Sequence, residues 1–256
     1  MEFTGERFIP EKLKETDETY QEHIERYKFT LDKISAKTVL DASCGAGYGS
    51  QMMARSAGHV HGIDISEESI RYAREKYGAS NITYEAMDIK KLKFPDRSFD
   101  VVVSFETIEH IGFQQEFVDE IRRVLKPGGA LIISTPNVET TPKGKAVHTP
   151  FHVKELNLDE MKALLAGFAN IEVYAQKMSY HKRLYKKIRL MSRYPKDDLR
   201  KSIVQFCKKR YANCEAMPVL PRIFFYEYAL KFKVFAFRET NAFIKPTFWV
   251  LKATRP

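Results

Sequence analysis

The 256-residue sequence predicts an α/β fold, in which helices wrap a largely parallel β-sheet. Short apolar runs alternate with amphipathic segments from about residue 37 to residue 176, and a glycine-rich loop directly follows the first apolar run. A third observation is the run 99–105 (FDVVVSF), which is apolar apart from Asp100 and Ser104. Such a run is typical of a central strand that is covered on both faces.

The elements follow from these patterns in chain order. Ser66 is suited to cap a helix whose first turn holds Glu67 and Glu68, and the KPGG segment 126–129 is expected to end a later helix. The predicted strands are 38–42, 58–64, 81–86, 99–105, 130–134, 171–176 and 247–253. The predicted helices are 50–55, 67–77, 114–125 and 158–168.

Composition excludes disorder as the main state, because 44% of the residues are hydrophobic and 29% are charged. The formal net charge of +9 comes from one segment, 180–243, which holds 16 Lys and Arg against 5 Asp and Glu. That segment also holds 13 of the 32 aromatic residues and has apolar residues at helical spacing. We therefore expect a basic, aromatic-rich helical insertion before the last strand, and its charge suggests an anionic partner.

Cysteine usage and the chain ends predict a cytoplasmic protein. Cys44, Cys207 and Cys214 are too few and too unevenly spaced for a disulfide framework or a four-ligand zinc site, so we expect free thiols in a reducing compartment. The first residues lack the apolar stretch of a signal peptide. The most apolar late window, 223–237, is too short and too charged to span a bilayer.

The glycine-rich loop is the first candidate binding site. In Gly45-x-Gly47-x-Gly49 the glycines allow the backbone to approach a ligand, and the following helix offers unpaired N–H groups. Asp64 ends the next strand, where a carboxylate can accept both hydroxyls of a ribose. The spacing disfavours dinucleotide dehydrogenases and P-loop NTPases, and a simple tight turn is the alternative to a binding loop.

In combination, the motifs resemble those of the class I S-adenosylmethionine-dependent methyltransferases. The matching segments, within about 37–137, are VLDASCGAGYG, HVHGIDIS, NITYEAMDIKKL, SFDVVVSFETIEHI and RVLKPGGALIISTPN. The resemblance implies a Rossmann-like seven-stranded sheet with its last strand antiparallel, flanking helices, and S-adenosyl-L-methionine as cofactor. In that strand order, the basic segment is an insertion between strands 6 and 7. Ser43 stands where this family most often has glycine.

The resemblance also implies which residues bind the cofactor. The loop 41–49 would hold its methionine moiety, Asp64 its ribose, and Met87 with Asp88 its adenine, although Asp88 could instead cap a turn. The expected cofactor-binding residues are Tyr20, Arg26, Asp41, Ser43, Gly45, Gly47, Asp64, Ile65, Met87, Asp88 and Phe105.

Three further segments resemble methyltransferases often found among glycan- and sugar-modifying enzymes. They are the N-terminal TGERFIPE and EHIERY and the later HTPFHVKEL. In that pattern Tyr20, Arg26 and Tyr27 would close over the cofactor, with Arg26 suited to its carboxylate. An amphipathic helix that only packs on the domain is the alternative for the N-terminal segment.

Methyl transfer requires the protein to position the acceptor and, for a hydroxyl, to remove its proton. The segment 106–110 (ETIEH) follows a strand at the edge where such sheets bind ligands, and further histidines follow the fifth strand. An imidazole suits a general base, but the sequence does not decide which histidine acts. The expected catalytic residues are Glu109, His110, His148 and His152.

A metal site is the less favoured interpretation of the same residues. E-x-x-E-H with a later histidine is similar to the metal site of small-RNA 3′-terminal 2′-O-methyltransferases. The matching ligands would be Glu106, Glu109, His110 and His152, a set that suits Mn²⁺, Co²⁺ or Zn²⁺ better than Mg²⁺. For His110 a purely structural hydrogen bond to the backbone is an alternative.

These expectations combine into a domain plan and a leading hypothesis. Residues 1–36 form a helical cap over the cofactor, 37–179 and 244–256 the core, and 180–243 a lid over the acceptor. The expected reaction is O-methylation of a sugar hydroxyl on an anionic glycan, nucleotide-sugar or glycosylated metabolite. The alternatives are a metal-assisted RNA ribose 2′-O-methyltransferase and a cofactor-binding scaffold without turnover. For the basic segment, peripheral contact with an anionic membrane or a solvated face with no ligand also stays open.

Overall fold

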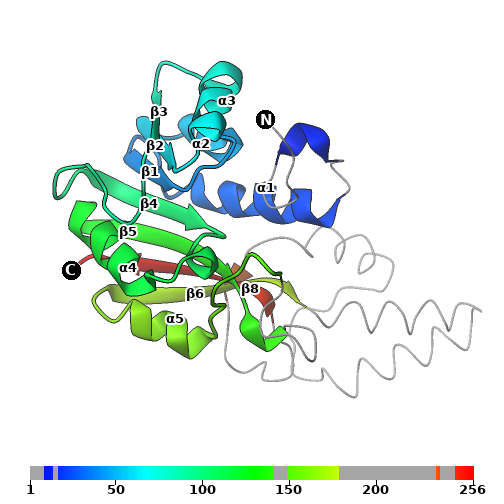
Figure 1. Ribbon diagram of the computed structural model, residues 1–256. Coiled ribbons are helices and arrows are strands. Elements are labelled where there is room, and N and C mark those ends of the chain that lie inside the picture. Colours follow the sequence, from blue (N-terminus) through cyan, green and yellow to red (C-terminus); the bar gives the residue numbers. More distant parts are fainter. Residues whose placement is uncertain (1–8, 14–16, 141–148, 179–234, 237–245) are drawn as a thin grey trace, which may run out of the picture.

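The computed structural model describes residues 9–13, 17–140, 149–178, 235–236 and 246–256. One mixed sheet forms the centre (Figure 1). Its strands are β1 Thr38–Ala42, β2 His59–Asp64, β3 Ile82–Ala86, β4 Phe99–Phe105, β5 Leu125–Pro136, β6 Ala169–Met178, β7 Phe235–Ala236 and β8 Pro246–Thr254. The α-helices are α1 Glu18–Thr30, α2 Tyr48–Ala54, α3 Glu67–Tyr77, α4 Gln114–Val124 and α5 Leu158–Leu164, with 3₁₀ turns at Pro10–Lys12, Ile108–His110 and Val138–Thr140.

The strand order is β3-β2-β1-β4-β5-β8-β6-β7. Strands β1 to β5 pair in parallel, whereas β8 runs antiparallel to both β5 and β6. This topology confirms the predicted Rossmann-like sheet of seven main strands with the last one antiparallel. The two-residue β7 adds an eighth strand at the edge of β6.

The predicted helical insertion 180–243 lies outside the described residues except for Phe235 and Ala236. These two residues are strand rather than helix, because they pair antiparallel with Ala175 and Tyr174 and so extend the edge of the sheet at β6. The domain boundaries predicted around this segment stay predictions.

Strand β4 shows why the sheet is buried on both faces. Val101 and Val103 point to the face packed by α1, α2 and α3, whereas Val102 points to the face packed by α4 and α5. All three side chains are fully buried. As predicted from its apolar run, the strand is therefore covered on both faces. A layer of helices and a hydrophobic core lie on each side of it.

Most predicted boundaries agree with the structure to within a few residues, and two differ for local reasons. Strand β5 begins at Leu125 instead of 130, because Leu125 already pairs with Phe99 before an irregularity at the KPGG segment, where Gly128 has a φ of 75°. Helix α5 ends at Leu164 instead of 168, because the chain turns there and the Phe168 N–H donates to the Leu165 carbonyl.

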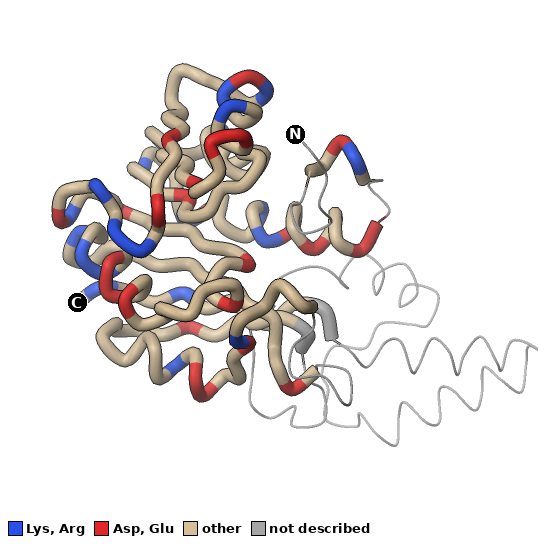
Figure 2. Tube along the Cα trace, viewed as in Figure 1, with Lys and Arg blue, Asp and Glu red and all other residues tan. Residues whose placement is uncertain are grey.

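Lys and Arg are interspersed with Asp and Glu along the described elements (Figure 2). The positive surplus of the sequence lies in the segment 180–243, which is almost entirely outside these elements. Within the described part of the chain, no helix combines the length and the apolar character that a membrane span requires.

Candidate active site

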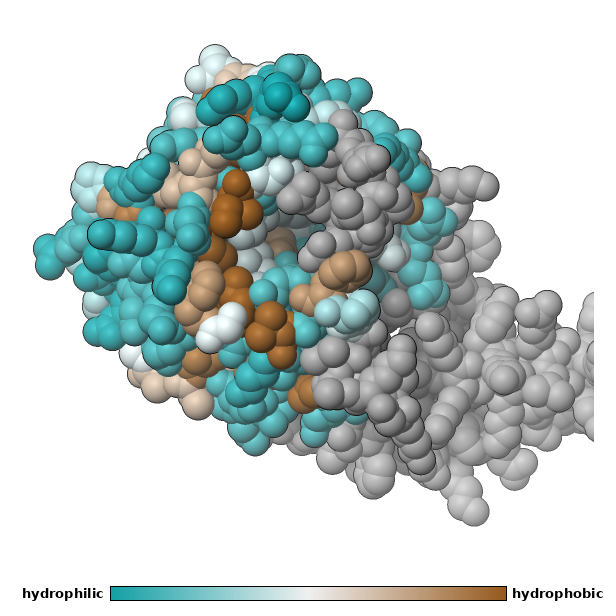
Figure 3. Space-filling model, in the orientation of Figure 1, coloured by the Kyte–Doolittle hydropathy of each residue, from teal (hydrophilic) through white to brown (hydrophobic). Residues whose placement is uncertain are grey.

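A cavity of about 770 Å³ opens at the carboxyl ends of the parallel strands, a size typical of cofactor and small-ligand sites. Figure 3 shows hydrophobic side chains along a hollow on this face. Two of the most exposed large apolar residues, Ile65 and Phe151, line the cavity. The residues that supply its polar and aromatic lining include Tyr27, Ser43, Gly45, Asp64, Asp88, Phe105, Glu106, Glu109, His110, Phe113, Phe151 and His152.

The glycine-rich loop lines one end of this cavity. Ser43 and Gly45 have positive φ angles of 68° and 54°, and a Cβ added at Gly45 would meet no atom within 4 Å. Gly47 serves packing instead, because an added Cβ there would lie 2.5 Å from the Cβ of Ala73. The loop therefore turns its backbone at Gly45 toward open space, as a ligand-binding loop requires.

Asp64 lies beside this loop at the end of β2. Its carboxylate accepts the Gly45 N–H at 3.0 Å and the Ser66 N–H at 2.9 Å. A carboxylate has about four acceptor positions, so two remain for a ligand in the cavity. The predicted ribose-binding residue thus both braces the glycine loop and lines the cavity.

Asp41 lies under the loop and not in the cavity wall. It is buried, and its carboxylate accepts the Ser50 hydroxyl at 2.7 Å and the Tyr27 hydroxyl at 3.4 Å. Burial raises the pKa of Asp41 to about 7, against the lowering effect of those two hydrogen bonds. Its contact with the cofactor stays a prediction, and in this structure it links α2 to α1 through these two hydroxyls.

The end of β3 supplies the predicted adenine-binding residues. Asp88 is exposed at the cavity, where its carboxylate also accepts the Lys90 N–H at 2.8 Å, so the turn cap and the binding role are compatible. Met87 is buried and lines a smaller adjoining hollow together with Ile65, whose side chain is 71% exposed. An exposed isoleucine beside a methionine offers an apolar surface for a planar ring.

Helix α1 packs against the glycine loop through Tyr27. A Cβ added at Gly49 would lie 2.0 Å from the Tyr27 ring, and this ring also makes edge contacts with Tyr48 and Phe105. Tyr20 lies on α1, partly buried, but is not among the residues lining the cavity. From α1, Tyr27 and His23 line the cavity, and closure of this helix over the cofactor stays a prediction.

Arg26 is placed differently from the role that the resemblance implied. Its guanidinium is buried, lies 2.9 Å from a Glu106 carboxylate oxygen, and donates to Gln176 at 2.8 Å. It also stacks over the Phe248 ring at 4.5 Å. Arg26 does not line the cavity, so a contact with the cofactor carboxylate stays a prediction, whereas its link between α1, β4 and β6 is a feature of the structure.

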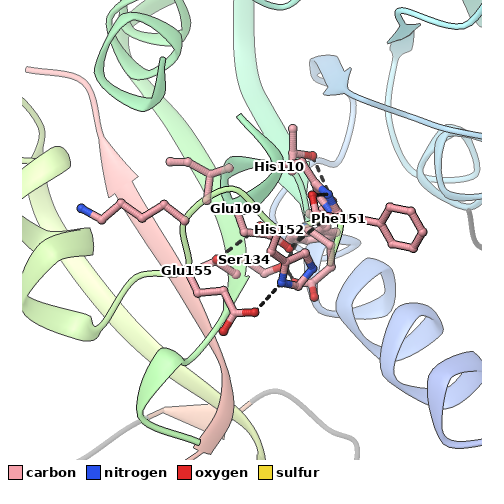
Figure 4. A network of polar contacts seen from close by, with 12 residues as sticks. Glu109, His110, Ser134, Phe151, His152 and Glu155 are labelled. Carbon is pink, nitrogen blue, oxygen red and sulfur yellow. Dashed lines mark hydrogen bonds and ion pairs between the residues drawn. The ribbon is translucent and has the colours of Figure 1, made fainter. Parts of the chain in front are cut away.

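Glu109, His110 and His152 come together on the other side of the cavity (Figure 4). The Glu109 side chain is completely buried, and one of its oxygens accepts the Thr135 hydroxyl at 3.2 Å. Burial, with the charge of Glu106, raises the pKa of Glu109 well above its ordinary value. The two imidazole rings meet edge to face with centroids 4.7 Å apart.

Contacts with the backbone hold this cluster together between two segments that lie 41 to 45 residues apart in the sequence. The N–H groups of Val153 and Lys154 both donate to the Glu109 carbonyl, at 2.7 and 3.1 Å. The His110 Nδ1 lies 3.2 Å from the Phe151 carbonyl oxygen, and the His152 Nδ1 lies 2.5 Å from a carboxylate oxygen of Glu155. Both histidines are thus oriented through Nδ1.

Of the four residues expected to bind a metal, Glu106 is the one that does not belong to this cluster. Besides the Arg26 ion pair, its carboxylate accepts the Ser134 hydroxyl at 2.7 Å. Glu106 has a φ of 50°, which is an unusual backbone conformation for this residue type at the end of a strand. His148, another predicted catalytic residue, lies outside the described residues.

Several residues that line or support the cavity were not predicted from the sequence. His23 donates to or accepts from the Tyr48 hydroxyl at 3.0 Å, and burial together with Arg26 lowers its pKa. Phe113 and Phe151 line the cavity, and Glu155 supports His152. For Glu155 the i, i+3 spacing from His152 was a usable signal, whereas nothing local distinguished the two phenylalanines from core residues.

S-adenosylmethionine fits what these residues offer. An amphipathic nucleoside with a ribose and a cationic tail needs a backbone that it can approach closely, acceptors for its hydroxyls and an apolar surface. Gly45, the remaining acceptor positions of Asp64, and exposed Ile65 supply these in one cavity. These three residues would hold the group, with Asp88 at the same wall.

Comparisons with known proteins point to methyltransferases. The family model described as "Methyltransferase domain" matches residues 33–191. A Mycolicibacterium smegmatis protein named "Probable S-adenosylmethionine-dependent methyltransferase" is 40% identical over 168 residues, 64% of each chain, so this chain spans less than two thirds of that relative. A "Ubiquinone biosynthesis O-methyltransferase" of Coxiella burnetii is 34% identical over 116 residues, 44% of this chain and 50% of the relative.

Among solved structures, an S-adenosylmethionine-dependent methyltransferase from Thermotoga maritima has the same fold, with a TM-score of 0.60 at 15% identity over 98% of both chains. The family match covers more than half of the present chain, and it includes the glycine loop, Asp64 and the Glu109 cluster. The chain therefore belongs to the class I S-adenosylmethionine-dependent methyltransferase family.

Proposed function

We propose that this chain is an O-methyltransferase that transfers a methyl group from S-adenosylmethionine to a sugar hydroxyl. One observation carries the proposal. A single cavity holds both the glycine loop with Asp64 and the cluster of Glu109, His110 and His152. The first set suits the cofactor, and the second suits an acceptor whose proton must be removed.

In the cofactor half of the cavity, each expected contact with S-adenosylmethionine has a candidate residue. Gly45 allows the backbone to approach the amino-acid end, Asp64 accepts the ribose hydroxyls, and Ile65 with Asp88 borders the adenine. When bound, S-adenosylmethionine supplies the methyl group and its sulfur is the leaving group. Tyr27 narrows this half of the cavity from α1, which supports the proposed role of residues 1–36 as a cap.

In the acceptor half, the chemistry of the lining favours oxygen. Transfer to a hydroxyl forms a C–O bond, breaks a C–S bond and releases the hydroxyl proton, so a hydroxyl acceptor needs a group that promotes proton loss. Glu109, His110 and His152 line the same cavity and are the candidates for this role. The Coxiella burnetii relative, whose name describes an O-methyltransferase, supports oxygen as the acceptor atom.

The sugar class rests on two weaker supports. Phe113 and Phe151 line the cavity beside the polar cluster, and the face of a sugar stacks on aromatic rings while its hydroxyls meet polar groups. The segments TGERFIPE and HTPFHVKEL resemble those of methyltransferases found among sugar-modifying enzymes. Because residues 180–243 hold 16 basic and 5 acidic residues, we propose that the acceptor is anionic and that this segment contacts it.

The proposal includes a cytoplasmic reaction, which the sequence favours through its few cysteines. Cys44 is buried and free, and it lies in the glycine loop without a disulfide partner among the described residues. A reducing compartment would keep it so.

The test is transfer of labelled methyl from S-adenosylmethionine into host-cell extract, which is divided into nuclease-sensitive and nuclease-resistant fractions before counting. We expect label in nuclease-resistant glycan or small-molecule material, and none with the Asp64→Ala variant. Label confined to the nuclease-sensitive fraction would replace the sugar proposal with RNA ribose methylation. Cofactor binding without label in either fraction would indicate a scaffold without turnover.

A further inference from the structure

The cluster of Glu109, His110 and His152 has the geometry of a metal site. One oxygen or nitrogen atom of each residue lies within 4.8 Å of the other two, and Glu109 Oε1 is 4.0 Å from His110 Nε2. Bonds of about 2.1 Å to a shared cation place its ligand atoms about 3–4 Å apart. Small side-chain movements would therefore bring all three ligands to one centre.

The buried Oε1 atom of Glu109 independently supports a bound cation. Its side chain is fully buried, and its Oε1 atom has no hydrogen-bond partner among the described residues, whereas the other carboxylate oxygen is held by Thr135. A buried carboxylate oxygen without a partner costs free energy. A cation bound at Oε1 would remove this cost.

Both histidines carry the supporting contacts that metal-binding histidines have. Such a residue usually bonds through its second ring nitrogen to a carboxylate or a backbone carbonyl, which fixes the ring and its tautomer. Here Glu155 holds Nδ1 of His152 at 2.5 Å, and the Phe151 carbonyl lies 3.2 Å from Nδ1 of His110. Nε2 is then the ligand atom of each ring.

We propose that Glu109, His110 and His152 bind one divalent transition-metal cation, with Glu155 and the Phe151 carbonyl as the groups that orient the two imidazoles. Two imidazoles and one carboxylate suit Mn²⁺, Co²⁺ or Zn²⁺ better than Mg²⁺. Glu106 is not a ligand in this proposal, because Arg26 and Ser134 engage its carboxylate.

The cation would act on the acceptor. Three protein ligands leave coordination positions open toward the cavity, and a sugar offers neighbouring hydroxyls that can fill them. A hydroxyl bound to the cation would have a lowered pKa, so its proton would pass to water in the cavity as the C–O bond formed and the C–S bond of S-adenosylmethionine broke. This role rests on the proposed function, whereas binding of the cation does not.

Direct metal titration tests the site without reference to turnover. The full chain, stripped with a chelator and dialysed, is titrated with Mn²⁺ and followed by the electron paramagnetic resonance signal of the free ion. Co²⁺ is followed by its visible absorption. We expect one equivalent to bind. Glu109→Gln and His152→Ala should each weaken binding about 30-fold or more, and Glu155→Gln about 10- to 100-fold.

His59→Ala is the matched control, because His59 contacts Thr83 on the surface of β2 and β3 and lies outside the cavity. Its affinity for Mn²⁺ should equal that of the wild type. Each variant is also titrated with S-adenosylhomocysteine, and unchanged affinity for that ligand shows that the fold is retained.

Two results would overturn the proposal: a wild-type protein that binds S-adenosylhomocysteine but not Mn²⁺ or Co²⁺, or Mn²⁺ binding that Glu109→Gln and His152→Ala leave unchanged. Methyl transfer that persists in full after chelation would overturn the role in acceptor activation. None of these results affects the proposed methyl transfer itself, which fails instead if S-adenosylhomocysteine does not bind or no acceptor is labelled.

Discussion

At the scale of single residues, Asp64 is expected to contribute most to cofactor binding. Its carboxylate braces the loop at Gly45 and keeps two acceptor positions for the ribose. Hydrogen bonds to a charged group contribute about 1.5–3 kcal/mol each, so Asp64→Ala should weaken S-adenosylhomocysteine binding about 100-fold or more. Isothermal titration calorimetry measures this, with Glu75→Ala on the exposed side of α3 as control. Equal affinity of Asp64→Ala and the wild type would contradict the assignment.

Asp41 predicts a pH dependence of stability. Burial raises its pKa from 3.8 to about 7 in the folded protein, so between these pH values the folded state holds a proton that the unfolded state has lost. The free energy of unfolding therefore falls as the pH rises toward 7 and levels off above it. Asp41→Asn cannot ionise but retains an acceptor for the Ser50 hydroxyl.

We expect the stability of Asp41→Asn relative to the wild type to rise by about 1–2 kcal/mol between pH 5.5 and 7.5 and to stay constant from 7.5 to 9. Urea unfolding of both proteins at each pH measures the difference. A difference that does not change with pH would show that Asp41 is already ionised at pH 5.5 in the folded protein.

Residue placement shows what a sequence can and cannot reveal. Gly45 and Asp64 were predictable, because they lie at the carboxyl ends of the parallel strands β1 and β2, and such ends meet at one edge of the sheet. The partners of Arg26 were not, because Glu106 and Gln176 lie 80 and 150 residues further along the chain. A motif suggests which ligand a charged residue could bind, but only the long-range packing shows whether that charge is already paired with another residue of the protein.

At the scale of elements, the contact between α1 and α2 positions the N-terminal helix over the loop. The Tyr27 ring occupies the space that a side chain at Gly49 would need. Gly49→Ala should therefore displace α1 and lower the free energy of unfolding by about 1–3 kcal/mol, as overpacking does. Urea unfolding measures the cost, and limited tryptic cleavage after Arg26 and Lys28 reports the loosening of α1.

Gly112→Ala is the control for this helix contact, because an added Cβ there meets no atom within 4 Å and its φ is not positive. It should be neutral in both measurements. If Gly49→Ala also leaves both unchanged, α1 does not depend on the close approach to α2, and its proposed role as a cap loses its structural basis.

Elements were predictable where their pattern is long and local. The strands β1 to β4 and the helix α3 agree with the apolar runs and the Ser66 cap, whose hydroxyl accepts the Ser69 N–H at 3.3 Å. Strand β7 was not predictable, because two residues carry no periodicity and their pairing with β6 is a tertiary contact. The early start of β5 also depends on a partner, Phe99, that the local sequence does not show.

At the scale of the whole molecule, the order of the strands separates the two halves of the proposed site. The loops after β1, β2 and β3 supply the cofactor half, and those after β4 and β5 supply the cluster. Periodicity predicted an α/β sheet, but its seven-stranded order and its antiparallel strand followed only from the family resemblance. The periodicity of apolar residues shows where strands and helices lie along the chain, but it does not show which strands are neighbours.

The same separation predicts that residues 180–234 are needed for acceptor methylation but not for cofactor binding. In the sequence these residues lie between β6 and β7, the last two strands at the edge of the sheet opposite β3, and both strands are remote in the strand order from the cofactor half. Replacing these residues with a short Gly-Ser linker should keep S-adenosylhomocysteine affinity within about threefold of the wild type. Acceptor methylation should be lost, because the basic residues proposed to contact an anionic acceptor are removed.

A second variant separates charge from bulk in this segment. Changing Lys182, Arg183, Lys186 and Lys187 to Gln keeps the length of the chain but removes four positive charges. If charge attracts the acceptor, this variant should raise KM and flatten its dependence on salt, while kcat changes little, because screened attraction acts on encounter rather than on the chemical step. Full methylation by the linker variant would show that the acceptor is held by the core alone, and loss of cofactor binding would place residues 180–234 within the folding unit of the sheet.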